Sequence, residues 1–150
     1  MKTLIEKIRK ERKQFDLKLQ NGADEDCIEI LKSQTVSKFN YTIPNEYLIF
    51  LRDVDGLFYN GIQIYSTKTV DQTPQNITIE GFVEANEMWR DDERKKSYLV
   101  FAESGDALYV HNLTNGNYEY VDRITLDVIE TKKTCEQLFD LILNHVLDNY

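Results

Sequence analysis

Apolar residues recur at helical spacing in the first third of the chain. Over residues 2–15 they fall on one side and most basic residues fall elsewhere, which predicts an amphipathic helix with a basic outer face. A second helix is predicted from about Asp24, because three consecutive acidic residues there complement the positive end of a helix dipole. The apolar positions are Leu4, Ile5, Ile8 and Phe15 in the first helix, and Cys27, Ile28, Leu31 and, as a further candidate, Ile30 in the second.

Two more helices are predicted, one in the stretch I-P-N-E-Y-L-I-F-L-R-D-V-D-G at 43–56 and one over 135–147. Pro44 suits the first turn of a helix, where its missing N–H is not needed. Asp55-Gly56 is typical of a stop followed by a turn. The inward positions are Tyr47, Leu48, Phe50, Leu51 and Val54 in the earlier helix, and Leu138, Phe139, Ile142, Leu143, Val146 and Leu147 in the later one.

Strand patterns occupy the middle of the chain. They cover 57–65, with an interruption at Asn60-Gly61, and then 98–101, 107–110, 118–124 and 126–129. Residues 66–76 are polar and predict a surface loop, while 77–89 begin with strand-like residues and end with helix-like ones. The turns between the later strands are too short for parallel crossovers, so we expect an antiparallel meander.

This order of elements predicts an α+β fold. We expect a single domain over residues 1–150, with an antiparallel, mainly meander sheet of about 4–6 strands and helices at both chain ends packed against it. No internal repeat, linker or low-complexity segment interrupts the pattern.

The net charge of −8 is unevenly distributed. Residues 1–20 carry a formal charge of +4, which leaves about −12 on the rest of the chain. An acidic body argues against direct nucleic-acid binding, which needs a basic footprint, and favours encounter with a basic partner. Solubility alone is the competing explanation. The nine tyrosines suit either an adhesive surface or half-buried strand positions.

The chain gives no sign of export or membrane insertion. Charges interrupt the apolar residues of the N-terminus, which is unlike a secretory signal, and no apolar run approaches the roughly 20 residues of a membrane span. Cys27 and Cys135 are far apart and lie in no metal-ligand motif, so we expect reduced, half-buried thiols in a cytoplasmic protein. A disulfide between them is the alternative, and no sequence pattern supports it.

Residue patterns for catalysis are sparse. His111 and His145 have no neighbour at metal-ligand spacing, and we expect surface or strand-end imidazoles. Ser104, in A-E-S-G-D, lacks the first glycine and the following helix of a nucleophile elbow. The run Asp91-Asp92-Glu93 alternates with basic residues and is interpreted as a solvated charge run rather than a metal site. The sequence therefore predicts no enzyme, no cofactor and no metal.

Four features resemble the SUKH superfamily, which includes many bacterial toxin-immunity proteins and fungal cell-wall-synthesis regulators of the Smi/Knr kind, and in particular its YrhA-like branch. The stretch 43–56 is similar to the family block L-P-x-x-Y-x-x-F-L-x-x-x-N-G, with Asp55 where Asn is usual. F-Y-N-G-I-Q-I-Y at 58–65 resembles the strand that follows that block. The other features are E-A-N-E-M-W-R at 84–90 ahead of Y-L-V-F-A-E-S-G at 98–105, and the closing amphipathic helix.

The resemblance implies a binding role. We expect a non-enzymatic immunity protein that neutralises a cognate polymorphic or contact-dependent toxin by binding and occluding it. The toxins of such families are frequently nucleases or nucleotide-modifying enzymes. The alternatives are a cytosolic regulatory adaptor for a cellular protein and, less favoured, a small-molecule binder or a cryptic hydrolase. The sequence does not reveal the oligomeric state.

Exposure, charge and aromatic character select the candidate contact residues. Aromatic anchors beside carboxylates are what such an interface uses. The first choices are Trp89, Asp91, Asp92 and Glu93, and the second choices are Glu103, Asp106 and Tyr118. For Trp89 the alternative is burial in the core.

Overall fold

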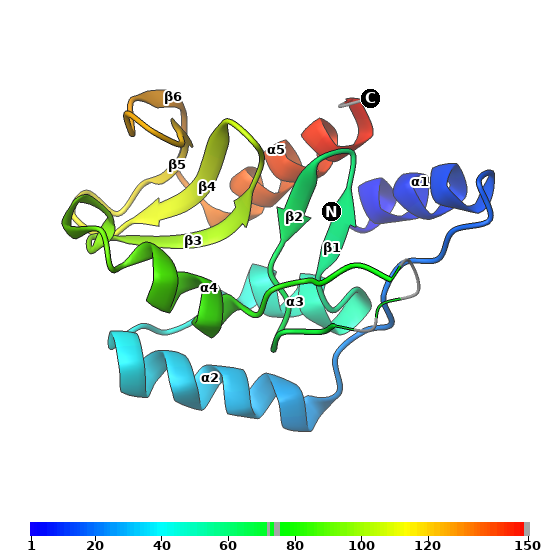
Figure 1. The fold of residues 1–150 in the computed structure, drawn as a ribbon, viewed down its shortest axis with the longest axis horizontal. Coiled ribbons are helices and arrows are strands. Elements are labelled where there is room, and N and C mark those ends of the chain that lie inside the picture. Colours follow the sequence, from blue (N-terminus) through cyan, green and yellow to red (C-terminus); the bar gives the residue numbers. More distant parts are fainter. Residues whose placement is uncertain (72, 74–75, 149–150) are drawn as a thin grey trace.

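One antiparallel sheet joins all the strands of this computed structural model, which describes residues 1–71, 73 and 76–148. Within these residues the sheet has six strands in the order β1-β2-β3-β4-β5-β6, so each strand pairs with its neighbour in sequence (Figure 1). The strands are β1 (Leu57–Tyr59), β2 (Ile62–Ile64), β3 (Tyr98–Glu103), β4 (Ala107–Asn112), β5 (Tyr118–Asp122) and β6 (Val128–Lys132). The predicted meander and α+β class are confirmed.

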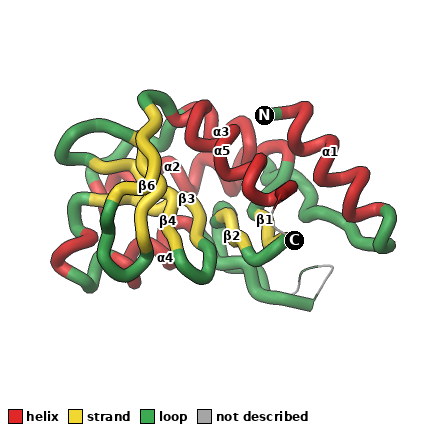
Figure 2. Tube along the Cα trace, turned by 90° about the horizontal axis from the view of Figure 1, so that it is seen from above, coloured by secondary structure: helices red, strands yellow, loops and turns green. Residues whose placement is uncertain are grey.

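Helices precede, interrupt and follow the strands. They are α1 (Lys2–Lys13), α2 (Glu25–Phe39), α3 (Asn45–Asp53), α4 (Phe82–Trp89), the short 3-10 helix η1 (Glu93–Lys95) and α5 (Cys135–Asp148). In the view of Figure 2, α3 and α5 lie on one side of β3 and β4, and α4 lies on the other. None of the helices that the structure describes is long and apolar enough to pass through a membrane.

The core between the sheet and the helices α3 and α5 is aromatic. The ring of Tyr47 lies 5.1 Å from that of Phe101 and 5.5 Å from that of Phe139, and none of the three side chains is accessible to solvent. One hydrophobic cluster runs from Ile5 to Val146, so a single core serves the whole domain. Several tyrosines, among them Tyr47, Tyr65 and Tyr109, therefore fill the interior rather than form an adhesive surface.

The stretch 43–56 forms α3 and the turn into the sheet, as predicted. Pro44 stands at the N-cap, one residue before the helix, and the predicted apolar face is buried. After the helix, the Asp55 carboxylate accepts hydrogen bonds from the Thr67 amide at 2.7 Å and the Thr67 hydroxyl at 2.9 Å. Gly56 adopts a φ of +85°, a conformation that favours glycine.

The predicted strand over 57–65 is a hairpin. Asn60 and Gly61 have φ values of +52° and +78°, the pair of positive values that a two-residue hairpin turn requires. The interruption is therefore a reversal of the chain, and Tyr59 pairs with Ile62 across it.

The predicted inward positions Phe15 and Ile30 are wrong. Phe15 is 67% exposed because α1 ends at Lys13 and the chain then turns away. Arg12 is buried in α1, where its Nη1 donates to the Phe58 carbonyl at 2.9 Å. In α2, which begins at its Asp24 cap as predicted, Ile28 and Leu31 are buried but Ile30 is 57% exposed. Ile30 lies about 100° around the helix from Leu31 and so faces solvent.

The ambiguous segment 77–89 divides at residue 81. Ile79 and Gly81 form isolated bridges with Val70 and Ser66, and the helix starts only at Phe82. The loop predicted over 66–76 lies partly outside the described residues, because it includes residues 72, 74 and 75.

The strand predicted over 118–124 ends at Asp122, and the last strand starts at Val128 rather than at Leu126. The Asp122 carboxylate accepts hydrogen bonds from the amides of Ile124 and Thr125, both at 2.8 Å, and Leu126 has a φ of +64°. These hydrogen bonds form a turn over residues 123–127, so the turn separates β5 from β6. The last helix, α5, buries the predicted positions except Leu147, which is partly exposed. Both cysteines are free, as expected.

Candidate functional site

Trp89, at the C-terminal end of α4, is held by three contacts. Its indole Nε1 donates a hydrogen bond to Tyr65 Oη at 2.8 Å. The Lys95 ammonium lies 5.1 Å and the Arg123 guanidinium carbon 4.9 Å from the ring centroid, where cations are attracted to the ring. The side chain packs against the core and is still partly exposed. It is therefore a rigid aromatic group at the surface.

Glu103, the last residue of β3, shares its environment with Trp89. Its carboxylate accepts a hydrogen bond from Gln63 Nε2 at 3.0 Å and forms an ion pair with Arg123 at 3.0 Å. Burial raises the pKa of Glu103, and the Arg123 charge opposes that rise. Arg123 also donates to the Ser104 carbonyl at 2.7 Å, so its guanidinium is fixed between the end of β3 and the Trp89 ring.

These two predicted residues line one cavity of about 280 Å³. Its other lining residues include Met88, whose side chain is 68% exposed. The complete lining is Glu80, Ala85, Met88, Trp89, Glu103 and Arg123. Sequence reasoning missed Glu80, Met88 and Arg123. No local pattern joins them, because the cavity combines residues from four separate segments that only the sheet register brings together.

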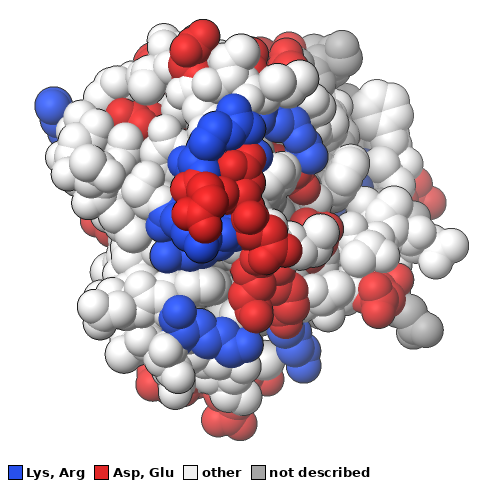
Figure 3. Space-filling view, turned by 60° about the vertical axis from the view of Figure 1, so that its left-hand side comes forward, with Lys and Arg blue, Asp and Glu red and all other residues white. Residues whose placement is uncertain are grey.

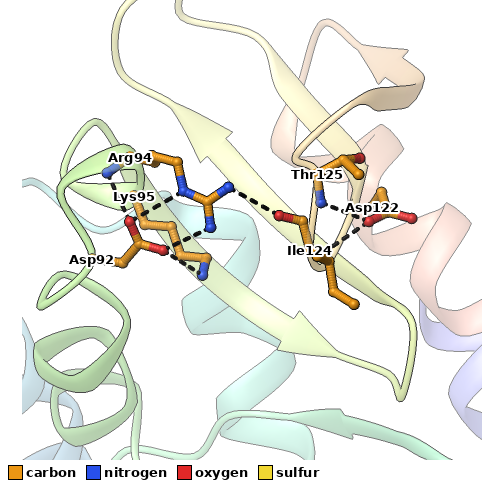
Figure 4. Close-up of polar contacts among 6 residues, drawn as sticks. All are labelled: Asp92, Arg94, Lys95, Asp122, Ile124 and Thr125. Carbon is orange, nitrogen blue, oxygen red and sulfur yellow. Dashed lines mark hydrogen bonds and ion pairs between the residues drawn. The ribbon is translucent and has the colours of Figure 1, made fainter.

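The Asp92 carboxylate is hydrogen-bonded to and ion-paired with residues that follow it closely in sequence. It caps η1 by accepting a hydrogen bond from the Arg94 amide at 2.9 Å, and it forms ion pairs with Arg94 at 3.0 Å and Lys95 at 3.1 Å (Figure 4). The hydrogen bonds from Arg94 hold the pKa of Asp92 well below its usual range. Asp92 therefore stabilises the fold of this segment. A charge-reversal experiment on the contact surface should leave Asp92 unchanged, so that the segment stays folded.

The segment around η1 is fastened to the turn between β5 and β6. Arg94 Nη1 donates to the Ile124 carbonyl at 3.0 Å, and Asp122 holds that same turn through the amides described above (Figure 4). The run 90–96 is thus only partly the solvated charge run that the sequence predicts. Lys95 is buried, whereas Asp91 and Glu93 are exposed.

Positive and negative groups alternate on this side of the molecule. Figure 3 shows Asp and Glu in a band through the centre of the face, bordered by Lys and Arg. The pairing is local, since Glu93 bonds Lys96 at 2.6 Å as Asp92 bonds Arg94. The face therefore offers a patterned set of charges rather than a uniform acidic surface.

The remaining predicted contact residues lie apart from one another. Asp106 is exposed in the turn between β3 and β4, where it accepts a hydrogen bond from the Ser104 hydroxyl at 2.9 Å. Tyr118 pairs with His111 at the other end of the β4-β5 ladder and stacks on its ring at a centroid distance of 4.0 Å. Burial raises the pKa of Tyr118 to about 12. The structure does not bring Tyr118 to the Trp89 cavity.

Both histidines are more than surface imidazoles. His111 Nδ1 lies 2.7 Å from Tyr41 Oη, and His145 Nδ1 lies 2.7 Å from Tyr109 Oη. His111 is also enclosed by the rings of Tyr41 and Tyr118. Burial lowers the pKa of His111 below its usual value, because the charged imidazolium loses its hydration there.

This burial predicts a pH dependence of stability. The native pKa of His111 lies below the unfolded value of 6.5, so the unfolded state takes up the proton first as the pH falls. We therefore expect the free energy of unfolding to be fully maintained above pH 6.5 and to decrease as the pH falls from there through the native pKa. Urea denaturation of the wild type at pH 7.5 and pH 5.0 measures the decrease. His111→Gln should reduce it, and an identical decrease in this variant would contradict the prediction.

The described residues do not assemble a familiar catalytic set. The Ser104 hydroxyl donates to Asp106 and accepts from the Ala107 amide at 3.1 Å, so it builds the turn rather than facing a base. Among the described residues, no group of three or more His, Cys, Asp or Glu could hold a metal ion. The cavity beside Trp89 is the candidate site because two of the predicted contact residues, Trp89 and Glu103, line it together.

No protein-family model matches the sequence, and no curated protein matches it either. The resemblance to the SUKH superfamily therefore stays a prediction that rests on the residues described above.

Proposed function

We propose that this chain is a non-enzymatic, cytoplasmic protein-binding domain, and specifically an immunity protein that neutralises a cognate toxin domain by covering its active site or substrate groove. The observation that carries the proposal is the rigid Trp89 with the exposed Met88 beside a cavity. Tryptophan is enriched among the residues that dominate interface energies, and methionine adapts to an opposing surface.

The surroundings of Trp89 support a docking role. Its three contacts fix the ring before binding, so little conformational entropy is lost when a partner covers it. The acidic residues nearest in sequence are paired locally, as Glu93 is with Lys96, so it is the net charge of −8 on the whole chain that can accelerate encounter with a basic partner. A nuclease is such a partner, because its substrate groove must attract phosphate.

The experiment pairs the chain with a toxin domain encoded beside its gene. Calorimetry with the purified domains measures binding, and a toxicity assay in cells measures protection. Binding together with protection supports the proposal. Binding without protection favours a regulatory adaptor, and no binding contradicts the proposal.

Met88→Ala tests the contact surface. We expect it to weaken binding of the toxin domain by about tenfold, equivalent to about 1.4 kcal/mol, because a buried apolar contact is lost. The thermal midpoint should be unchanged, since Met88 is 68% exposed in the free protein. The matched control is Ile30→Ala, which removes an apolar side chain that is 57% exposed on α2. Equal affinities of the two variants would remove the Met88 surface from the interface.

A further inference from the structure

The cavity beside Trp89 is sized for a side chain. Its volume of about 280 Å³ falls below the roughly 300–1,000 Å³ that is usual for small-molecule sites. One wall is the aromatic ring of Trp89, and Met88 stands at an exposed position beside it. These dimensions fit the end of one long side chain from another protein.

The charges in the cavity are not balanced. Two carboxylates, Glu80 and Glu103, and one guanidinium, Arg123, line it. Arg123 pairs with Glu103 at 3.0 Å. The Glu80 carboxylate makes no hydrogen bond or ion pair with any other described residue, and its charge raises the pKa of Glu103. One negative charge is therefore left for a cation from outside.

The cavity already shows how it holds a cation. The guanidinium of Arg123 lies against the Trp89 ring at 4.9 Å and on the Glu103 carboxylate. An aromatic face combined with a carboxylate is a recurring environment for arginine. The backbone of Glu80 is held beside this pair, since its amide donates to Gln63 Oε1 at 2.6 Å and its carbonyl accepts from the Ser66 amide at 3.0 Å.

We infer that this cavity receives a lysine or arginine side chain of the partner protein, with Glu80 as the counter-ion and Met88 covering the aliphatic stem. The inference rests on the proposed function, because it names the chemistry by which the partner is recognised. The incoming cation joins the existing pair of Glu103 and Arg123 rather than replacing it. The cavity then contains two cations and two carboxylates.

The test uses a short peptide, acetyl-Gly-Arg-Gly-amide, and the fluorescence of Trp89, the single tryptophan of the chain. We expect a saturable change in emission with the wild type. Glu80→Gln keeps the shape of the side chain and removes its charge, and should weaken binding by about fivefold to tenfold, as for a partly buried charged pair. The neutral peptide, in which citrulline replaces arginine, should bind weakly and with the same affinity to the wild type and to Glu80→Gln.

Asp91→Asn is the matched control, because it removes the same charge from an exposed position that does not line the cavity. Unchanged peptide affinity in Asp91→Asn and weaker affinity in Glu80→Gln support the inference. Equal weakening in both variants would show general charge attraction and overturn it, as would wild-type affinity in Glu80→Gln. Circular dichroism of both variants confirms that they are folded.

The same variants separate this inference from the proposed function. If a toxin domain binds the wild type and Glu80→Gln equally well, the cavity inference is overturned and the immunity function stands. If the arginine peptide binds through Glu80 but no toxin domain does, the cavity chemistry is supported and the immunity function fails.

Discussion

We expect Asn86→Ala to lower the free energy of unfolding by about 3–4 kcal/mol, because Asn86 satisfies both backbone groups of Val100 in the interior. Its Nδ2 donates to the Val100 carbonyl at 2.9 Å, and its Oδ1 accepts from the Val100 amide at 2.7 Å. β2 stops at this point, since its last pair with β3 joins Ile64 and Ala102. The Asn86 side chain takes the place of the missing strand.

The magnitude follows from the burial. Asn86 and Val100 are both inaccessible to solvent, and each backbone group left unpaired there costs about 1–3 kcal/mol. Such a loss is a large fraction of the roughly 5–15 kcal/mol that stabilises a domain. Urea denaturation of the wild type and the variant at pH 7.5 measures it.

Asn144→Ala is the matched control. Asn144 in α5 also donates from Nδ2 to the carbonyl four residues earlier, that of Asp140, as Asn86 does to that of Phe82. Asn144 is exposed, and among the described residues its side chain makes no hydrogen bond to the backbone of a strand. Its replacement should therefore change the free energy of unfolding by less than about 0.5 kcal/mol. Similar losses in the two variants would refute the role of Asn86 as a strand substitute.

The second large effect is expected for Gly56→Ala, which should cost about 3 kcal/mol of stability. A Cβ atom there would lie 2.7 Å from the Ser66 Cβ and 2.8 Å from the Ile79 Cγ2, and both neighbours are buried. Overpacking of this kind costs about 1–3 kcal/mol. The positive φ of +85° adds about 1–2 kcal/mol for any residue with a Cβ.

Gly116→Ala separates these two contributions. Gly116 has a φ of +78°, but a Cβ there would meet nothing within 4 Å, so only the backbone cost of about 1–2 kcal/mol is expected. Thermal and urea unfolding of both variants measure the difference. If Gly116→Ala destabilises as much as Gly56→Ala, the close packing against Ser66 and Ile79 does not matter.

A chain of hydrogen bonds connects the stretch 43–56 with the candidate site. The Tyr47 hydroxyl donates to the Tyr65 carbonyl at 2.6 Å, and the Tyr65 hydroxyl accepts from Trp89 Nε1. The stretch that resembles the family block therefore contributes to the position of Trp89 without lying on the surface itself. Residues 43–56 contain no catalytic or ligand-binding group, and these hydrogen bonds are how they can still influence the candidate site.

The candidate site could be predicted only in part. Residue type selects Trp89 and Glu103 from the sequence, and the structure brings these two together. The expected exposure of Glu103 is wrong, because it ends β3 and its side chain is only 14% exposed. The same reasoning proposed Asp92 as a surface contact, although its carboxylate is occupied by Arg94 and Lys95. Asp106 and Tyr118 do not line the cavity: Asp106 touches the site only through its carbonyl, which accepts from the Arg123 amide at 2.9 Å, and Tyr118 is half-buried beside His111. Residue type shows what a side chain can bind, whereas its neighbours determine whether it is available.

The sequence by itself determined the class of fold and most element positions. Apolar periodicity gives α3 and α5 because burial of one face repeats every 3.6 residues, and short turns require adjacent antiparallel strands. Tertiary structure alone decided that Arg12 is buried, that Asn86 replaces a strand, and that Glu80 and Glu103 line one cavity. Each depends on contacts between segments distant in the chain, and those contacts form only when the sheet register and helix packing bring the segments together.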